Sequence, residues 1–109
     1  MTTDPFAAAQ LGPITLRNRT IKAATFEGAA PGGLVSDQLI DYHLAVAEGG
    51  VGMTTVAYLA CSPEGRTHAD QIHWRPEALP GLRRLTDAIH ATGASIAAKS
   101  PPDGQTWMV

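Results

Sequence analysis

The strongest constraint on the fold of this chain is an alternation between two hydrophobic patterns. Residues 51–60 (VGMTTVAYLA) and 94–99 (ASIAAK) are short and apolar almost throughout, which is typical of strands that are covered by helices. Each of them follows a segment that carries apolar residues at helical spacing. Strands that alternate with helices pair in parallel through right-handed crossovers, so the pattern predicts an α/β fold.

Both expected helices have start and stop signals. The first begins after Ser36, with Asp37 in a first turn where negative charge suits the helix dipole, and the glycine pair 49–50 ends it. The second begins in a region bracketed by two prolines and ends at Gly93. The positions that recur at helical spacing are Leu39, Ile40, His43, Leu44, Val46 and Ala47 in the first helix and Leu82, Leu85 and Ile89 in the second.

The remaining segments add one strand and two loops. Residues 11–19 carry a short extended pair around a Gly-Pro turn, and residues 20–24 (TIKAA) are a candidate strand. Residues 25–33, with three glycines and a proline, and the polar residues 61–75 are expected loops. Three parallel strands and two helices suit either a small open sheet or about three of the eight strands of a (β/α)8 barrel. We expect residues 1–109 to form a single domain.

Composition narrows the class of protein. The 109 residues are 44% hydrophobic and 17% charged, which is typical of a globular chain. A formal net charge of -2 offers no basic excess for binding nucleic acid or an anionic membrane. The apolar runs are too short to span a bilayer, and the first residues do not resemble a signal peptide. The one cysteine, Cys61, is interpreted as small buried filler, and we expect a soluble cytoplasmic protein.

Three strings, in this order, carry a family resemblance: LGPITLRNRTIKAA (11–24), GLVSDQLIDYHLAVAEGGVGMTTVAYLACSPEGR (33–66) and LPGLRRLTDAIHATGASIAA (79–98). Together they resemble the amino-terminal part of the Old Yellow Enzyme family of NADH:flavin oxidoreductases. The resemblance implies a (β/α)8 TIM barrel that binds FMN at the carboxyl ends of its strands, with this chain supplying about the first three βα units. It also implies that NAD(P)H gives hydride to FMN, which passes it to an activated alkene or a similar small-molecule acceptor.

The resemblance implies five cofactor-binding residues. Ala23, Ala24, Thr25 and Phe26 lie at the end of the first strand, and Ala60 lies at the end of the second. Small side chains at these places let the backbone approach a flat ring closely. The family commonly has Thr or Cys after strand one, within hydrogen-bonding reach of the flavin, where it tunes the reduction potential. The register of this chain puts Phe26 at that position, and a shift by one residue would put Thr25 there.

The resemblance stops at Ala98. The family continues with a Gln that binds the flavin, whereas this chain has Lys99 and a divergent tail, 99–109, whose two prolines cannot continue a central strand. The family's substrate-binding pair, proton donor and phosphate-binding loops would lie beyond this chain. We therefore expect a truncated FMN-dependent oxidoreductase with no catalytic residue of its own, inactive alone and able to self-associate through open sheet edges. The alternative is a non-catalytic small α/β interaction module.

Three further patterns have structural interpretations. Residues 49–52 (GGVG) lie between a helix and a strand, whereas a dinucleotide fingerprint needs a strand that runs into a glycine turn and then a helix. His68, Asp70 and His73 match no zinc-ligand spacing and are interpreted as polar loop residues, so no metal site is expected. Residues 17–19 (RNR) precede the first strand, on the face of a barrel where residues usually serve stability.

Overall fold

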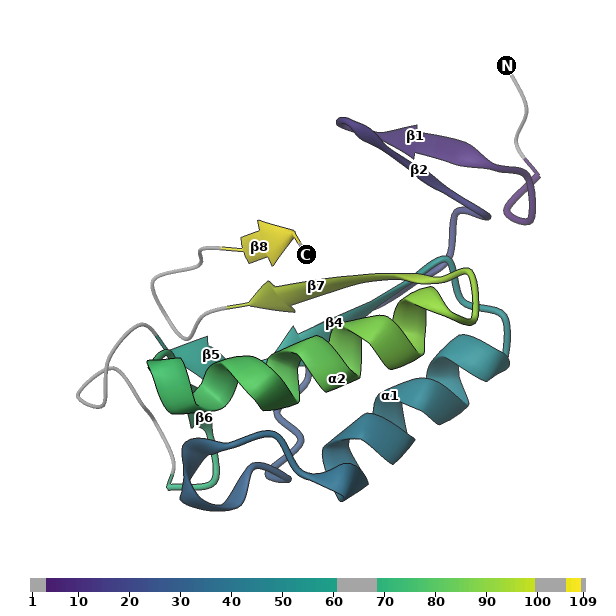
Figure 1. The fold of residues 1–109 in the computed structure, drawn as a ribbon. Coiled ribbons are helices and arrows are strands. Elements are labelled where there is room, and N and C mark those ends of the chain that lie inside the picture. Colours follow the sequence, from purple (N-terminus) through teal and green to yellow (C-terminus); the bar gives the residue numbers. More distant parts are fainter. Residues whose placement is uncertain (1–3, 61–68, 100–105, 109) are drawn as a thin grey trace.

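A computed structural model describes residues 4–60, 69–99 and 106–108, and within them two α-helices and eight short strands (Figure 1). The helices are α1 (Asp37–Glu48) and α2 (Leu79–His90), each preceded by a 3-10 turn, η1 (Pro31–Gly33) and η3 (Pro76–Ala78). The strands are β1 (Ala9–Leu11), β2 (Ile14–Leu16), β3 (Ile21–Lys22), β4 (Met53–Ala57), β5 (Leu59–Ala60), β6 (Ile72–His73), β7 (Ser95–Lys99) and β8 (Thr106–Met108). No helix in this part of the chain is long and apolar enough to cross a membrane.

The central sheet confirms the predicted α/β topology. Its strand order is β3-β4-β7-β8, and β3, β4 and β7 run parallel. Met53 pairs with Ile21 on one side and with Ser95 on the other, so the three parallel strands begin level with one another. Both α1 and α2 cover the same face of the sheet (Figure 1). The carboxyl ends of the parallel strands therefore meet at one edge, which is where α/β proteins bind ligands.

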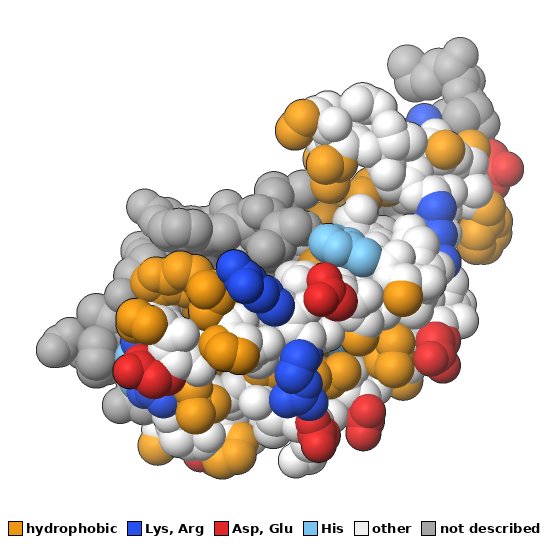
Figure 2. Space-filling model, viewed as in Figure 1, with side chains coloured by type: hydrophobic (Ala, Val, Ile, Leu, Met, Phe, Trp, Pro, Cys, Tyr) orange, Lys and Arg blue, Asp and Glu red, His pale blue; other side chains and the backbone are white. Residues whose placement is uncertain are grey.

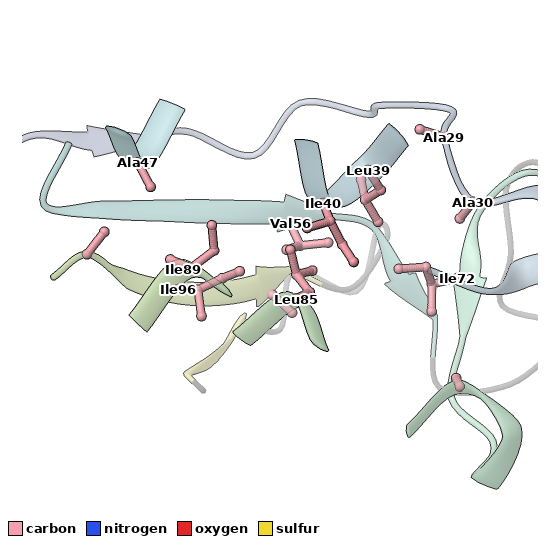
Figure 3. Packing of buried hydrophobic residues seen from close by; sticks show 13 residues of the cluster. Ala29, Ala30, Leu39, Ile40, Ala47, Val56, Ile72, Leu85, Ile89 and Ile96 are labelled. Atoms are coloured by element: carbon pink, nitrogen blue, oxygen red, sulfur yellow. The ribbon is translucent and has the colours of Figure 1, made fainter. Parts of the chain in front are cut away.

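The main hydrophobic core lies between this face of the sheet and the two helices (Figure 3). Leu39 of α1, Leu85 and Ile89 of α2, and Ile96 of β7 are among its fully buried side chains. Burying one such aliphatic side chain contributes about 1.5–3 kcal/mol. The three helical residues occupy positions expected from their helical spacing, so the predicted apolar stripes are the surfaces that pack.

A hairpin packs against one end of the other face of the sheet. β1 and β2 pair antiparallel, with Leu11 opposite Ile14, which confirms the extended pair predicted for residues 11–19. Side chains alternate along a strand, so Met53 and Ala97 point away from the helices. They form a second, smaller cluster with Leu16 of β2, and Ile14 packs against it. The hairpin thereby anchors the amino-terminal segment beneath the sheet.

The structure divides the second predicted strand in two. Residues 51–60 form β4 and the separate two-residue strand β5, which pairs in parallel with β6. β6 lies within residues 61–75, which were predicted as a loop, and both of its residues are buried. The first predicted strand, 20–24, is likewise reduced to the two residues of β3. Strands of two residues carry too few side chains to show a period of two, so no sequence pattern predicts them.

The far edge of β7 carries a strand that the sequence does not predict. β8 runs antiparallel to β7, with Trp107 opposite Ala98 and Thr106 opposite Lys99. The β7 edge is therefore paired, and β8 becomes the edge strand on that side. In the part of the chain that the structure describes, the two edge strands of this sheet are β3 and β8. Exposed edge strands are templates for pairing with another chain.

Replacing Ser36 with alanine is expected to lower the free energy of unfolding by about 1 kcal/mol. Ser36 caps α1: its Oγ accepts the N–H of Leu39 at 3.1 Å and donates to the carbonyl of Ala29 at 2.5 Å. Urea unfolding followed by far-UV circular dichroism measures the loss. Ser36→Asn is the matched control, because asparagine also caps helices and should lose only a few tenths of a kcal/mol. Equal losses in the two variants would contradict the capping role.

Candidate functional site

The candidate site lies where β3 ends, at the carboxyl edge of the central sheet. Ala23, Ala24, Thr25 and Phe26 directly follow β3 in a stretch without regular secondary structure. Three of them are exposed and Ala24 is half-buried. Because alanine side chains are small, the backbone at the first two positions is accessible to a flat ligand. The structure thus brings four of the five predicted residues together as one accessible run, 23–26.

An aromatic pair links this run to the end of β4. The rings of Phe26 and Tyr58 are stacked, with centroids 6.2 Å apart and planes inclined by 5°. Such pairs contribute about 0.5–1.5 kcal/mol beyond the area they bury. Phe26 remains 37% exposed, so it lies partly at the surface of the run. Phenylalanine has no side-chain hydrogen-bonding group, which leaves the hydroxyl of Thr25 as the side-chain donor of the run.

The fifth predicted residue, Ala60, has a different environment. It is fully buried in β5, opposite His73 of β6. Its carbonyl accepts the N–H of Trp74 at 2.7 Å. Ala60 is therefore buried in this structure, and its small size suits the packing of the β5–β6 pair. Its burial sets Ala60 apart from the accessible run.

A buried polar network follows the run directly. Oε2 of Glu27 lies 3.0 Å from Nε2 of His43, and Nδ1 of His43 lies 2.7 Å from Oγ1 of Thr54. The Glu27 carboxylate also accepts the N–H of Ala57 at 3.2 Å. The side chains of Glu27 and His43 are only 4% and 0% exposed. The network joins the loop after β3 to α1 and to both ends of the β4 segment 54–57.

The sequence interpretation assigned no chemistry to these residues, although one signal was present. His43 belongs to the stripe of α1 that recurs at helical spacing, and a polar side chain in a buried stripe needs a hydrogen-bonding partner. Thr54 is one of two adjacent threonines in a mostly apolar strand segment and is a candidate for that partner. Glu27 lies in a glycine-rich loop, 16 residues from His43, where no periodicity connects the two.

The opposite end of the sheet is held by Arg17. Its Nε and Nη2 donate to the carbonyl of Val51 at 3.1 and 2.9 Å, and Nη2 also donates to that of Ala47 at 2.6 Å. Its Nη1 donates to the carbonyl of Thr92 at 2.6 Å. Residues 49–52 join α1 to β4, so this glycine-rich segment is the predicted helix stop. These bonds agree with the stabilising role predicted for the amino-terminal end of the first strand.

Within residues 4–60, 69–99 and 106–108, no three His, Cys, Asp or Glu side chains lie close enough together to hold a metal ion. Two of the three residues considered for a metal site are described. The carbonyl of Asp70 accepts a backbone N–H, and the ring of His73 is buried beside Arg75. His68, and also Cys61 with its predicted burial, lie outside the described residues.

The surface over the helices mixes charges of both signs. Figure 2 shows Lys and Arg side chains next to Asp and Glu side chains across this face. Arg84 of α2 forms one exposed ion pair there with Asp37 of α1. Exposed pairs of this kind contribute only about 0–1 kcal/mol. On the face shown, a charged partner would meet no patch of a single sign.

Comparisons with known proteins cover nearly the whole chain. The model of the NADH:flavin oxidoreductase / NADH oxidase family matches residues 4–105. The 4,4'-dithiodibutanoate disulfide reductase of Rhodococcus erythropolis is 61% identical over 103 residues, which make up 91% of this chain and 26% of that protein.

Solved structures share the fold. Morphinone reductase in complex with tetrahydroNAD has a TM-score of 0.82 at 23% identity, covering 99% of this chain and 28% of that one. Old Yellow Enzyme from Pichia sp. AKU4542 has a TM-score of 0.77 at 18% identity, covering 84% of this chain and 24% of that one. The chain therefore spans about a quarter of the length of these proteins. The likeness confirms the prediction of a partial (β/α)8 barrel, and the described residues form no closed one.

Proposed function

The chain belongs to the NADH:flavin oxidoreductase / NADH oxidase family, and from this premise we propose that it supplies part of the surface that binds FMN in an oxidoreductase of the Old Yellow Enzyme type. In the proposed reaction NAD(P)H is the reductant, and an activated alkene or a similar small molecule is the acceptor. Hydride transfer requires donor, flavin and acceptor to be held in one geometry. The 109 residues are proposed to be inactive by themselves, because they span only 26% of a 61% identical relative.

The observation that carries this proposal is the accessible run 23–26 at the carboxyl end of β3. Barrel enzymes bind their ligands at this end of the strands. A flavin ring is flat and needs close contact with backbone, which alanines at 23 and 24 allow. The exposed part of the Phe26 ring extends the apolar surface. The residues of the run therefore fit the ring, whereas the buried Ala60 would reach it only after a rearrangement of β5.

Each residue of the run has a proposed role. The bound flavin would supply the capacity to take up and pass on hydride. Ala23 and Ala24 would let the ring lie against the backbone. Thr25 would donate the hydrogen bond to the ring that Phe26 cannot. Phe26, stacked on Tyr58, would exclude water from one edge of the ring.

Adding FMN to the 15N-labelled chain is expected to shift the amide signals of residues 23–26 before those of other residues, because this run is the accessible part of the proposed site. Ala23→Leu is expected to weaken the titrated affinity by about tenfold, which corresponds to about 1.4 kcal/mol, since a branched side chain keeps the ring off the backbone. Two-dimensional 1H–15N spectra over an FMN titration measure both effects.

Ala45→Leu is the matched control for this titration, because Ala45 is exposed on α1, outside the proposed site. It should leave the FMN affinity unchanged. Riboflavin should shift the same amide signals as FMN, because the proposed contact is with the ring. Shifts centred on other residues, or equal weakening by both leucine substitutions, would contradict the proposal.

A second candidate function, a non-catalytic interaction module, is favoured by β8. This strand occupies the edge of β7 to which a barrel adds its next parallel strand, and β3 stays open to a partner or a second copy. Size-exclusion chromatography with detection at about 450 nm, where bound flavin absorbs, distinguishes the flavin-binding surface from the interaction module. A yellow species favours the flavin surface, and a colourless folded oligomer favours the module.

In both cases the cytoplasm is the proposed compartment, because the single cysteine can form no internal disulfide.

A further inference from the structure

We propose that Glu27 is a positioning residue for the run 23–26, held in place by His43 and Thr54. This inference rests on the proposed function, in which the run carries the flavin. Glu27 directly follows Phe26, and its side chain turns inward and is 4% exposed while Phe26 is 37% exposed. The network therefore connects an accessible, irregular segment to the most buried part of α1 and β4.

A single residue of β4 holds Glu27 by both its backbone and its side chain. The N–H of Glu27 donates to the carbonyl of Ala57 at 3.4 Å, and its carboxylate accepts the N–H of Ala57 at 3.2 Å. Tyr58, the next residue, stacks on Phe26. The strand end and the run are thus joined at neighbouring positions, so the carboxylate sets where the Phe26 ring lies relative to Tyr58.

The Glu27 carboxylate is compensated by donors from two elements. Burying an ionised carboxylate is costly unless hydrogen-bond donors replace the lost water. Here the donors are the N–H of Ala57 and the ring of His43, which is itself fully buried. A fully satisfied polar network of this kind rigidifies its surroundings, whereas a partly satisfied one destabilises them. Removal of the carboxylate therefore releases the run from the sheet.

The geometry assigns one proton of the network. An ionised carboxylate only accepts hydrogen bonds, so Nε2 of His43, 3.0 Å from Oε2 of Glu27, carries a proton. The hydroxyl of Thr54 can then donate to a neutral ring or accept from an imidazolium. In Glu27→Gln the amide oxygen can take the place of Oε2 and accept from both Nε2 of His43 and the N–H of Ala57. The substituted network then keeps these bonds and the tautomer of His43 while it loses the negative charge.

Three variants test the proposal: Glu27→Ala, Glu27→Gln and, as a matched change of charge, Glu48→Gln at an exposed position of α1. The first two measurements need no flavin. 15N relaxation gives the order parameters of residues 23–26, and 15N shifts of labelled histidine give the protonation of Nδ1 and Nε2 in His43. An FMN titration of the same samples is the third measurement.

In the unsubstituted chain we expect order parameters of about 0.85 for residues 23–26. In Glu27→Ala we expect values below about 0.6 for these residues, with the order parameters of α2 unchanged. Glu27→Gln should keep the run ordered and Nε2 of His43 protonated, and Glu48→Gln should change neither. The FMN affinity should fall by about tenfold in Glu27→Ala, as is typical when a partner that orients a binding group is lost.

Two results would overturn the positioning role: unchanged order of the run in Glu27→Ala, or equal disorder in Glu27→Gln and Glu27→Ala. An unprotonated Nε2 in the unsubstituted chain would also overturn it. If Glu27→Ala unfolds, Glu27→Gln decides: an ordered run with a protonated Nε2 supports the role, and a disordered run overturns it. If the unsubstituted chain shows no shift with FMN, the proposed function fails, while relaxation and histidine shifts still decide the role of Glu27.

Discussion

Replacing Arg17 with alanine is expected to lower the free energy of unfolding by about 3 kcal/mol or more, because each hydrogen bond to a charged donor contributes about 1.5–3 kcal/mol. The guanidinium donates to the carbonyls of Ala47, Val51 and Thr92. These carbonyls lie in or just after the last turns of the two helices, where the helix dipole favours a nearby cation. Urea unfolding followed by far-UV circular dichroism measures the loss.

Two other substitutions are the controls for Arg17→Ala. Arg17→Lys keeps the charge, but a single ammonium cannot match the planar fork of five donors, so about half of the loss should remain. Arg83 is exposed on α2, and Arg83→Ala should change stability by no more than about 0.5 kcal/mol. A cost at Arg83 equal to that at Arg17 would show that the effect is one of overall charge and not of the carbonyl contacts.

Gly52→Ala is expected to destabilise the chain by about 2–4 kcal/mol, in the range found when a side chain is forced into a packed site. A Cβ atom at Gly52 would lie 2.5 Å from the carbonyl oxygen of Asn18 and 3.1 Å from that of Thr20. The backbone cannot retreat easily, because the N–H of Gly52 donates to Thr20 at 2.9 Å and its carbonyl accepts from Ser95 at 2.9 Å. Thermal unfolding followed by circular dichroism measures the change.

Gly32→Ala separates the steric effect at Gly52 from the general effect of replacing a glycine. Gly32 has a φ of 69°, and a Cβ atom there would meet nothing within 4 Å. Its substitution should therefore cost only the strain of a positive φ, about 1–2 kcal/mol. If Gly32→Ala proved as damaging as Gly52→Ala, close approach of the strands at Gly52 would not be the cause.

The parts of the fold that sequence patterns predict are those with enough residues to show a period. α1 and α2 have twelve residues each: Ser36 caps α1 as expected, and the two helices end close to the expected glycines. β5 and β6 have two residues each, and their pairing depends on a contact between segments twelve or more positions apart. The antiparallel pairing of β8 is unexpected for a related reason: parallel topology follows from alternating elements, but nothing in residues 106–108 specifies which way a returning strand runs.

The candidate site likewise has one part that the sequence predicted and one part that it did not. The run 23–26 was predicted because it resembles a family pattern, and the structure shows that it is accessible at a strand end. Whether it binds FMN stays a prediction. The Glu27–His43 contact was not predicted, because a loop carboxylate gains its partner only when the loop folds back over α1 and β4. A buried polar contact between segments distant in sequence has no periodic signature, although the polar His43 in a buried stripe indicates that a partner exists.

The hydrogen bond between Arg17 and Thr92 joins residues that are 75 positions apart. At about 5–20 residues per second, a ribosome needs roughly 4–15 s to synthesise the chain between them. α1 and β4 can assemble during this interval, and Ala47 and Val51 can already accept from the guanidinium. β4, buried along its whole length in the finished fold, meanwhile lacks β7 as a neighbour. A nascent chain at this stage exposes an apolar strand edge, which makes it a substrate for chaperones that bind such surfaces during translation.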